Sequence, residues 1–233
     1  MRAWLAGLIA LSLCAGCSWS RTAGAPMLPA DRNAPLVYAA LGDSTVEGVG
    51  ASSAAANYVS RLHARLRERY PEARLVNLGV GGATSRDVLE EQLERAVALH
   101  PHLVTLSIGP NDITGKVPVE AYADNLDAIL GRLATQTRAV VVVNLLPDLA
   151  ITPRFRGGDA AEVVGRLSAE FNQVVARTAQ RHGTVVVDLY GPSRREVPER
   201  PELVAADGYH PSDLGYARWA ELMWDVVVTR IGS

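Results

Sequence analysis

The stretch Leu36-Val37-Tyr38-Ala39-Ala40-Leu41-Gly42-Asp43-Ser44-Thr45 joins an uninterrupted apolar run to a short polar turn. An apolar run of this kind is typical of a strand that is covered on both faces, as in a parallel sheet. The turn then places a serine hydroxyl at the carboxyl end of that strand. The stretch therefore predicts a buried parallel strand with polar chemistry at its end.

Four more apolar runs follow along the chain, separated by segments with helical periodicity. Alternating strands and helices are typical of βαβ units, whose right-handed crossovers leave few topologies. The sequence therefore predicts an α/β fold, a three-layer αβα sandwich around a five-stranded parallel sheet. Strands are expected at Leu36–Leu41, Arg74–Leu78, Leu103–Ile108, Ala139–Leu145 and Thr184–Leu189, and helices at Asn57–Tyr70, Ser85–Leu99, Pro118–Thr135, Ala161–His182 and Asp213 to about Arg230.

Several helix ends are marked by residues with a known capping role. Thr84-x-x-Asp87 is typical of a capping box, and Ser212 is a suitable cap for the last helix. Pro118 fits the first position of a helix, and Gly183 is expected to end one.

A polar segment follows each predicted strand. In an open parallel sheet, the carboxyl ends of the strands share one edge, where such folds bind their ligands. We therefore expect residues that are distant in the sequence to meet there. The segments are Gly42-Asp43-Ser44-Thr45, Gly79-Val80-Gly81-Gly82-Ala83-Thr84, Gly109-Pro110-Asn111-Asp112, Pro147-Asp148 and, after a longer loop, Asp207-Gly208-Tyr209-His210-Pro211.

Ser44 and His210 form a candidate nucleophile and base, because a serine hydroxyl needs a base to accept its proton. The other four histidines lie in predicted helices or at their ends, where a solvated surface position is the simpler interpretation. A carboxylate is also needed to orient the imidazole, and Asp207 lies three residues before His210. Asp43 and Asp112 are the alternatives, and Asp207-Gly208 also has the composition of a plain turn. The other histidines are His63, His100, His102 and His182.

Three donors are available for the oxyanion that develops during acyl transfer. They are the backbone N–H groups of Ser44 and Gly82 and the side-chain amide of Asn111. Taken singly, Gly82 also fits a tight turn and Asn111 an ordinary loop position. Their occurrence together with Ser44 and His210 favours an oxyanion hole.

Several other classes of protein are excluded or disfavoured. Gly79-Val80-Gly81-Gly82 lacks the G-x-G-x-x-G frame of dinucleotide-binding folds, and neither a P-loop lysine nor the G-x-S-x-G nucleophile elbow is present. The formal net charge of −2 and the scattered arginines argue against nucleic acid as a partner. A non-catalytic binding module and a flavodoxin-like nucleotide-binding protein are the remaining alternatives.

The four polar blocks resemble those of the SGNH hydrolases, also called GDSL-type esterases, over about residues 36–230. The family's blocks are matched in order by Gly42-Asp43-Ser44, by Asn77-Leu78-Gly79-Val80-Gly81-Gly82-Ala83-Thr84 with Gly82 as the oxyanion glycine, by Gly109-Pro110-Asn111-Asp112, and by Asp207-Gly208-Tyr209-His210-Pro211. The one departure is Thr45, where the GDSL motif has leucine. The resemblance implies a flavodoxin-like sandwich and an ester hydrolase.

In the mechanism that this resemblance implies, Ser44 attacks an ester carbonyl, and His210, oriented by Asp207, takes and returns the proton. The N–H groups of Ser44 and Gly82 and the Asn111 amide hold the oxyanion. No metal ion or cofactor is expected.

The amino terminus has the pattern of an export signal. Arg2 precedes an apolar run from Ala3 to Leu13, which is too short to span a bilayer. Ala15-Gly16-Cys17 resembles a bacterial lipoprotein cleavage site, which would anchor the protein to a membrane through a lipid on Cys17; Cys14 is unusual there. The interpretation is a leader at 1–17, a flexible tether at 18–35 and a hydrolase domain at 36–233. An ordinary secretory or periplasmic signal, an uncleaved anchor and a Cys14-x-x-Cys17 redox or metal site are the alternatives.

The sequence leaves the ester open. The family includes acylesterases, thioesterases, lysophospholipases and carbohydrate deacetylases, so lipid and carbohydrate esters are both candidates. The loop from Pro147 to Asp159 suggests a pocket for an acyl chain with a nearby anion, although a plain surface loop is the simpler interpretation. Its residues of interest are Ile151, Arg154, Phe155 and Arg156.

Overall fold

A computed structural model describes residues 25–232, so the predicted leader at 1–17 lies outside the described residues. Five parallel strands form one sheet in the order β2-β1-β3-β4-β5. The α/β class and the five-stranded parallel sheet are confirmed. The strands are β1 (Leu36–Gly42), β2 (Ala73–Asn77), β3 (Leu103–Ser107), β4 (Val140–Asn144) and β5 (Val185–Val187).

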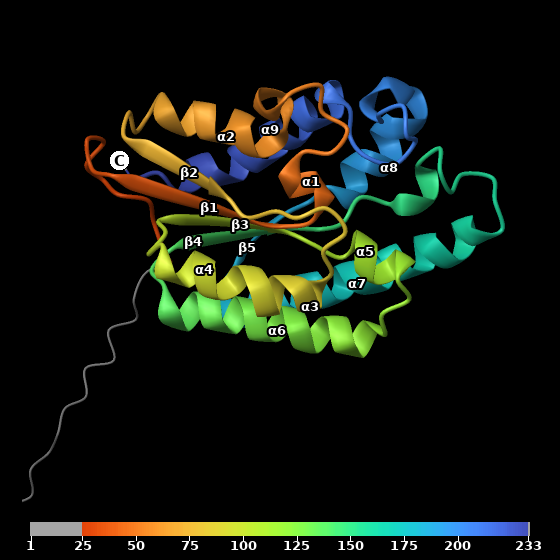
Figure 1. Cartoon of the computed structure of the whole chain (residues 1–233), viewed down its shortest axis with the longest axis horizontal. Coiled ribbons are helices and arrows are strands. Elements are labelled where there is room, and N and C mark those ends of the chain that lie inside the picture. Colours follow the sequence, from red (N-terminus) through yellow and green to blue (C-terminus); the bar gives the residue numbers. More distant parts are fainter. Residues whose placement is uncertain (1–24, 233) are drawn as a thin grey trace, which may run out of the picture.

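Helices cover both faces of the sheet, so the fold has the three αβα layers that the sequence predicts (Figure 1). One face carries α1 (Ser44–Glu47), α2 (Tyr58–Arg67), α8 (Tyr190–Glu199) and α9 (Asp213–Val227). The other carries α3 (Ser85–Asp87), α4 (Leu93–Ala98), α5 (Pro110–Thr114), α6 (Val119–Gln136) and α7 (Ala160–His182). Short helical turns complete the chain at η1 (Ala54–Ala56), η2 (Val88–Gln92), η3 (Leu149–Ile151), η4 (Pro201–Leu203) and η5 (Val228–Arg230).

The buried residues form two apolar clusters, one on each face of the sheet. Strand residues alternate between them: Val141 and Val143 of β4 pack on the α6–α7 side, whereas Val140 and Val142 pack on the α9 side. This alternation is the two-residue period of a strand. Asn144, two residues after Val142, therefore also places its side chain on the α9 side.

The predicted helix ends are largely as expected. Thr84 and Asp87 form a full capping box, Ser212 caps α9, and Gly183 ends α7 in the left-handed conformation. Pro118 lies one position earlier than predicted, as the cap before Val119. The predicted helix at 85–99 is continuous but contains the π turn η2.

Part of the predicted tether packs on the domain. Leu28 is only 2% exposed, and its N–H donates a 2.7 Å hydrogen bond to the carbonyl of Arg230. Arg32 donates to the hydroxyl of Tyr70 and to the carbonyl of Gly232. The chain therefore packs on the domain from before Leu36, because the apolar side chain of Leu28 is buried beside the carboxyl-terminal residues.

Among residues 25–232, no helix is long and apolar enough to cross a membrane.

Candidate active site

Ser44 lies at the first position of α1, directly after β1, and is 8% exposed. The turn depends on Gly42, whose φ is +144°, because a Cβ there would lie 1.9 Å from the carbonyl oxygen of Ser107. Asp43 then caps α1: its Oδ1 accepts 2.9 Å and 2.8 Å hydrogen bonds from the N–H and hydroxyl of Thr45. Strand, glycine and cap together hold the serine at the carboxyl edge of the sheet.

His210 reaches Ser44 from a loop that lies far along the chain. Its Nε2 lies 2.9 Å from Ser44 Oγ, and its Nδ1 lies 2.6 Å from Asp207 Oδ2. With the Nδ1 proton donated to Asp207, Nε2 is left as the acceptor for the serine hydroxyl. The three predicted side chains therefore form one continuous hydrogen-bonded row.

Asp207 is held in place by its own turn. Its Oδ1 accepts hydrogen bonds from the backbone N–H groups of Tyr209 and His210, at 2.9 Å and 3.0 Å, and Gly208 supplies a φ of +73°. Burial acts to raise the pKa of Asp207, but the His210 ring and the two backbone donors outweigh it and hold that pKa below its usual value. The carboxylate therefore stays charged beside the imidazole.

The other candidate carboxylates bind elsewhere. Asp43 is fully buried and is itself the cap of α1, and Asp112 accepts hydrogen bonds from the N–H and hydroxyl of Ser85. Asp213, three residues after His210, accepts hydrogen bonds from Ser52 instead. None of the three hydrogen-bonds to His210.

The three predicted oxyanion donors lie on neighbouring loops. Within residues 25–232, neither the Ser44 nor the Gly82 N–H donates a hydrogen bond to the protein. Gly82 has a φ of +83° and open space where a Cβ would stand, so conformation, rather than crowding, favours glycine there. One Asn111 Nδ2 hydrogen is donated to the carbonyl of Ala83 at 2.9 Å, which orients the amide and leaves its second N–H available.

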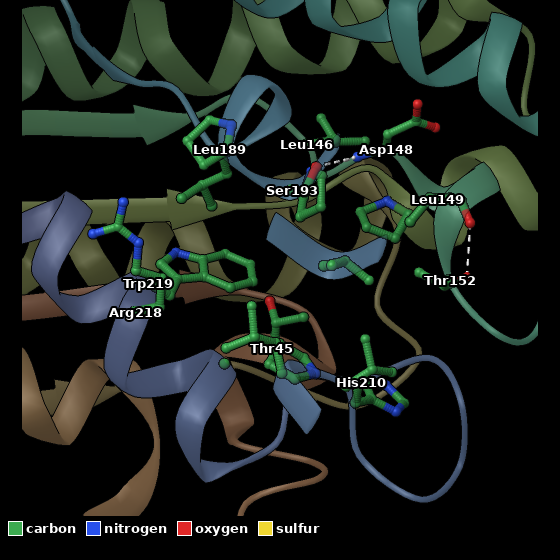
Figure 2. A pocket seen from close by; sticks show the side chains of 18 of the residues that line it. Thr45, Leu146, Asp148, Leu149, Thr152, Leu189, Ser193, His210, Arg218 and Trp219 are labelled. Carbon is green, nitrogen blue, oxygen red and sulfur yellow. Dashed lines mark hydrogen bonds between the residues drawn. The ribbon is translucent and has the colours of Figure 1, made fainter. Parts of the chain in front are cut away.

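A cavity opens beside Ser44 and His210 on the α9 side of the sheet. It crosses the strand ends in order, with Thr45 after β1, Ser107 of β3, Asn144 of β4 and Leu189 after β5 along one wall. Figure 2 shows Trp219 lying between Leu189 and Thr45. The empty space is about 950 Å³ with its open mouth included. Most of the remaining lining is apolar and comes from the loop after β4, from α8, from η4 and from α9: Leu146, Pro147, Leu149, Ile151, Pro192, Val197, Leu203 and Leu222.

Comparison with known proteins identifies the family. The model of the GDSL-like Lipase/Acylhydrolase family matches residues 40–218, most of the chain. The chain belongs to this family. It is therefore a carboxylic ester hydrolase, and the resemblance read from the four polar blocks is confirmed.

Two relatives and one solved structure are similar to this GDSL-like hydrolase over most of its length. An acetylxylan esterase of Geobacillus stearothermophilus is 28% identical over 75% of this chain and 83% of its own length. A GDSL-like esterase of Mycobacterium tuberculosis is 32% identical over 78% of this chain, which spans only 59% of that relative. The LAE5 enzyme from the metagenome of Lake Arreo, at 24% identity, shares the fold with a TM-score of 0.69 over 87% of this chain and all of that one.

The loop after β4 contributes less to the cavity of this GDSL-like hydrolase than expected. Ile151 lines the cavity, whereas Arg154, Phe155 and Arg156 are not among its lining residues. The Arg154 guanidinium instead lies over the ring of Tyr209, 5.0 Å from its centroid, and the Arg154 N–H donates to the carbonyl of Gly208. These contacts pack the loop against the turn that carries His210.

Sequence reasoning missed α8 and the wall that it forms. Pro192 and Pro198 suggest a broken loop, but Pro192 lies in the first turn, where the missing N–H costs nothing, and Pro198 lies near the end. The polar side chains of Ser107 and Asn144 in the cavity wall were also missed. One signal was present in the sequence, since each lies at the end of a predicted strand.

Among residues 25–232, no group of three or more His, Cys, Asp or Glu side chains is arranged to hold a metal ion.

Proposed function

We propose that Ser44 is the nucleophile of this hydrolase, with His210 as its base and Asp207 as the group that orients the imidazole. Ser44 Oγ forms a bond to the ester carbonyl carbon as its proton passes to His210 Nε2. The imidazolium returns that proton to the departing alcohol, which leaves an acyl-enzyme. Water repeats the sequence and releases the acid.

The oxyanion of both steps is held by the N–H groups of Ser44 and Gly82 and by the Asn111 amide. Two observations support this assignment. The backbone donors have no partner in the described part of the chain, and Ala83 fixes the orientation of the amide. Donors fixed in advance stabilise the developing charge without reorganising during the reaction.

The substrate that the site supports best is an ester whose acyl chain enters the cavity beside Ser44. The observation that carries this proposal is the mostly apolar lining that leads away from Ser44 and His210. An alkyl chain gains free energy from every methylene that it removes from water, at about 0.8 kcal/mol each. A polar sugar ring would gain much less against such walls.

The test combines Ser44→Ala with a series of p-nitrophenyl esters from acetyl to palmitoyl. We expect Ser44→Ala to abolish hydrolysis and labelling by a fluorophosphonate probe while the protein stays folded. In the wild type, kcat/KM should rise from acetyl to a medium chain length. Full activity in a clean Ser44→Ala preparation would overturn the assignment of the nucleophile, and a maximum at acetyl would overturn the acyl cavity.

A second candidate function is deacetylation of acetylated xylo-oligosaccharides. The likeness to an acetylxylan esterase favours it. The two functions differ in where the specificity lies, since a deacetylase recognises the sugar and needs no long acyl pocket. Release of acetate from acetylated xylo-oligosaccharides, with a kcat/KM above that for medium-chain esters, would favour this alternative.

We also propose that the protein is exported and anchored through a lipid on Cys17. The support is the apolar run from Ala3 to Leu13 followed by Ala15-Gly16-Cys17. Metabolic labelling with a fatty acid tests this: the wild type should be labelled and found with membranes, and Cys17→Ser should be neither. A soluble, unlabelled wild-type protein would refute the anchor.

A further inference from the structure

Glu196 of α8 and Arg218 of α9 form an ion pair in the wall of the cavity. Arg218 Nε donates to both carboxylate oxygens of Glu196, at 3.2 Å and 3.0 Å, and Nη2 donates to Oε1 at 2.9 Å. Such a forked pair fixes both side chains more firmly than a single contact does. The position of both side chains in the cavity wall is therefore fixed by these hydrogen bonds.

The pair lies in the part of the cavity away from the catalytic residues, where the lining on α9 continues to Leu222. Figure 2 shows Arg218 on one side of the view and His210 on the other, with Thr45 and Trp219 between them. Across the sheet, the cavity passes from Thr45 after β1 to Leu189 after β5, the strand that leads into α8. Three strand spacings of about 4.8 Å separate β1 from β5, so the cavity runs roughly 14 Å across the sheet.

Glu196 and Arg218 lie where the cavity lining meets solvent. Both line the cavity, yet their side chains are 23% and 35% exposed, so one side of the pair meets the cavity and the other meets water. Within the described part of the chain, no other hydrogen bond joins α8 to α9. The ion pair therefore spans the gap between the two helices.

An alkyl chain cannot easily push this pair apart. Parting the two charges beside an apolar chain would leave each partly desolvated without its partner, which is costly. Arg218 Nη1 also donates to Glu221 at 3.2 Å, and Glu221 does not line the cavity. This second carboxylate holds the guanidinium from the solvent side.

We propose that the Glu196–Arg218 ion pair is the end wall of the acyl cavity and sets the longest acyl chain that the enzyme hydrolyses efficiently. The proposal rests on the proposed function, in which the acyl chain of the ester occupies this cavity. It makes Glu196 and Arg218 determinants of chain-length specificity with no part in the chemical steps at Ser44.

The experiment measures kcat/KM for p-nitrophenyl esters from acetyl to palmitoyl and uses the ratio of the long-chain to the butyryl value. Removing the wall should extend the usable chain. Because a single methylene changes discrimination in an apolar pocket by about tenfold or more, Glu196→Ala and Arg218→Ala should each raise this ratio about tenfold. Glu221→Ala is the matched control, since it removes the other partner of the same arginine without opening the cavity.

Two further variants keep the test independent of one substitution. Glu196→Gln keeps the size of the side chain but removes its charge, so it should raise the ratio less than Glu196→Ala does; a rise as large as that of Glu196→Ala would mean that charge alone, and not the size of the wall, sets the ratio. Val197→Phe fills the cavity near its end and should lower the ratio by about tenfold, and it does so with the ion pair intact. Thermal unfolding of each variant identifies any that fail to fold.

The outcomes separate this proposal from the one on which it rests. If Val197→Phe lowers the ratio but Glu196→Ala and Arg218→Ala leave it at the wild-type value, the acyl cavity stands and the end wall is refuted. An equal rise in Glu221→Ala would also refute the wall, because loss of the arginine's charge balance would then explain the effect. If Val197→Phe leaves the whole chain-length profile unchanged while hydrolysis still depends on Ser44, the acyl cavity itself fails, and the wall fails with it.

Discussion

Asp43 and Asp207 are two carboxylates near Ser44 whose pKa values are shifted in opposite directions. Asp43 is fully buried and its Oδ2 has no hydrogen-bond partner in the described structure, so burial raises its pKa to about 6 despite the hydrogen bonds from Thr45. The pKa of Asp207 is lowered, because the hydrogen bonds from His210 and the backbone outweigh the effect of burial. Environment therefore separates a capping carboxylate from the one that remains charged beside the imidazole.

The raised pKa of Asp43 predicts a pH-dependent effect of Asp43→Asn on stability. A carboxyl with a higher pKa in the folded state than in the unfolded state favours folding at low pH, and that contribution is lost as pH rises from about 4 through 6. The isosteric amide does not titrate. Relative to the wild type, Asp43→Asn should therefore gain about 2 kcal/mol in free energy of unfolding between pH 4 and pH 8. Urea titrations at the two pH values measure it, and an equal difference at both would contradict the prediction.

Asn111 is the oxyanion donor that a substitution can remove most directly. Asn111→Ala should lower kcat by about 10²–10³, with KM changed far less, because the donor acts on charge that develops only in the transition state. Loss of the hydrogen bond to the Ala83 carbonyl should cost about 1 kcal/mol of stability. Steady-state kinetics on one medium-chain ester measure the effect. Asn111→Asp keeps the size without the donor, so near wild-type activity in that variant would point away from an oxyanion role.

At the scale of elements, the π turn η2 inside the predicted helix at 85–99 is joined to the end of β1 by a side chain. Its last residue, Gln92, is buried and donates to the carbonyl of Gly42 while accepting from the Gly42 N–H, both at 2.8 Å. A side-chain amide thus pairs with the backbone of the last residue of β1. The wider turn and the catalytic turn of β1 are therefore linked through these two hydrogen bonds.

Gln92→Met tests this link between elements. The apolar replacement keeps most of the volume but leaves the buried N–H of Gly42 without a partner, whereas the Gly42 carbonyl keeps its 3.1 Å hydrogen bond from the N–H of Val80. We expect a loss of about 1–3 kcal/mol in the free energy of unfolding, measured by urea denaturation. Glu91→Ala, an exposed neighbour in the same turn, is the control and should change stability little. A neutral Gln92→Met variant would mean that water or a shift of the chain satisfies Gly42.

The limits of prediction are also clear at the scale of elements. The helices with strong caps and periodicity were predicted to within a few residues, because those signals are local. The helix α8 was missed because Pro192 and Pro198 suggest breaks, and only the position of each proline within the helix makes it compatible. The strand β5, Val185–Val187, is shorter than the predicted Thr184–Leu189 and ends before the charged Asp188.

At the scale of the whole molecule, the two ends of the described chain meet at the edge of the sheet opposite the active site. Leu28 pairs with Ile231 in an isolated parallel bridge next to the carboxyl end of α9, whereas His210 precedes the amino end of that helix. The catalytic edge and the anchoring of the amino-terminal segment are therefore separated by the length of α9.

This separation predicts that Leu28→Ala affects stability and not catalysis. Truncation of a buried leucine should cost about 2–5 kcal/mol in free energy of unfolding, while kcat and KM at a temperature where the variant is folded stay at wild-type values. Thermal unfolding and ester hydrolysis measure the two effects. Met27→Ala is the control, since Met27 is 48% exposed and its truncation should be nearly neutral. Equal effects at positions 27 and 28 would mean that the segment is not packed as described.

The sequence by itself determined the order of strands and helices and the residues gathered at the catalytic edge. Apolar periodicity is a local signal, and the geometry of a parallel sheet brings its strand ends together without further information. Ser44, Gly82, Asn111, Asp207 and His210 could therefore be selected before any contact between them was known. Only the tertiary structure decided where the cavity runs and that Glu196 of α8 pairs with Arg218 of α9 in its wall. Those features depend on the packing of α8 and α9 on the sheet, and no local pattern of residues encodes how two helices separate around an empty space.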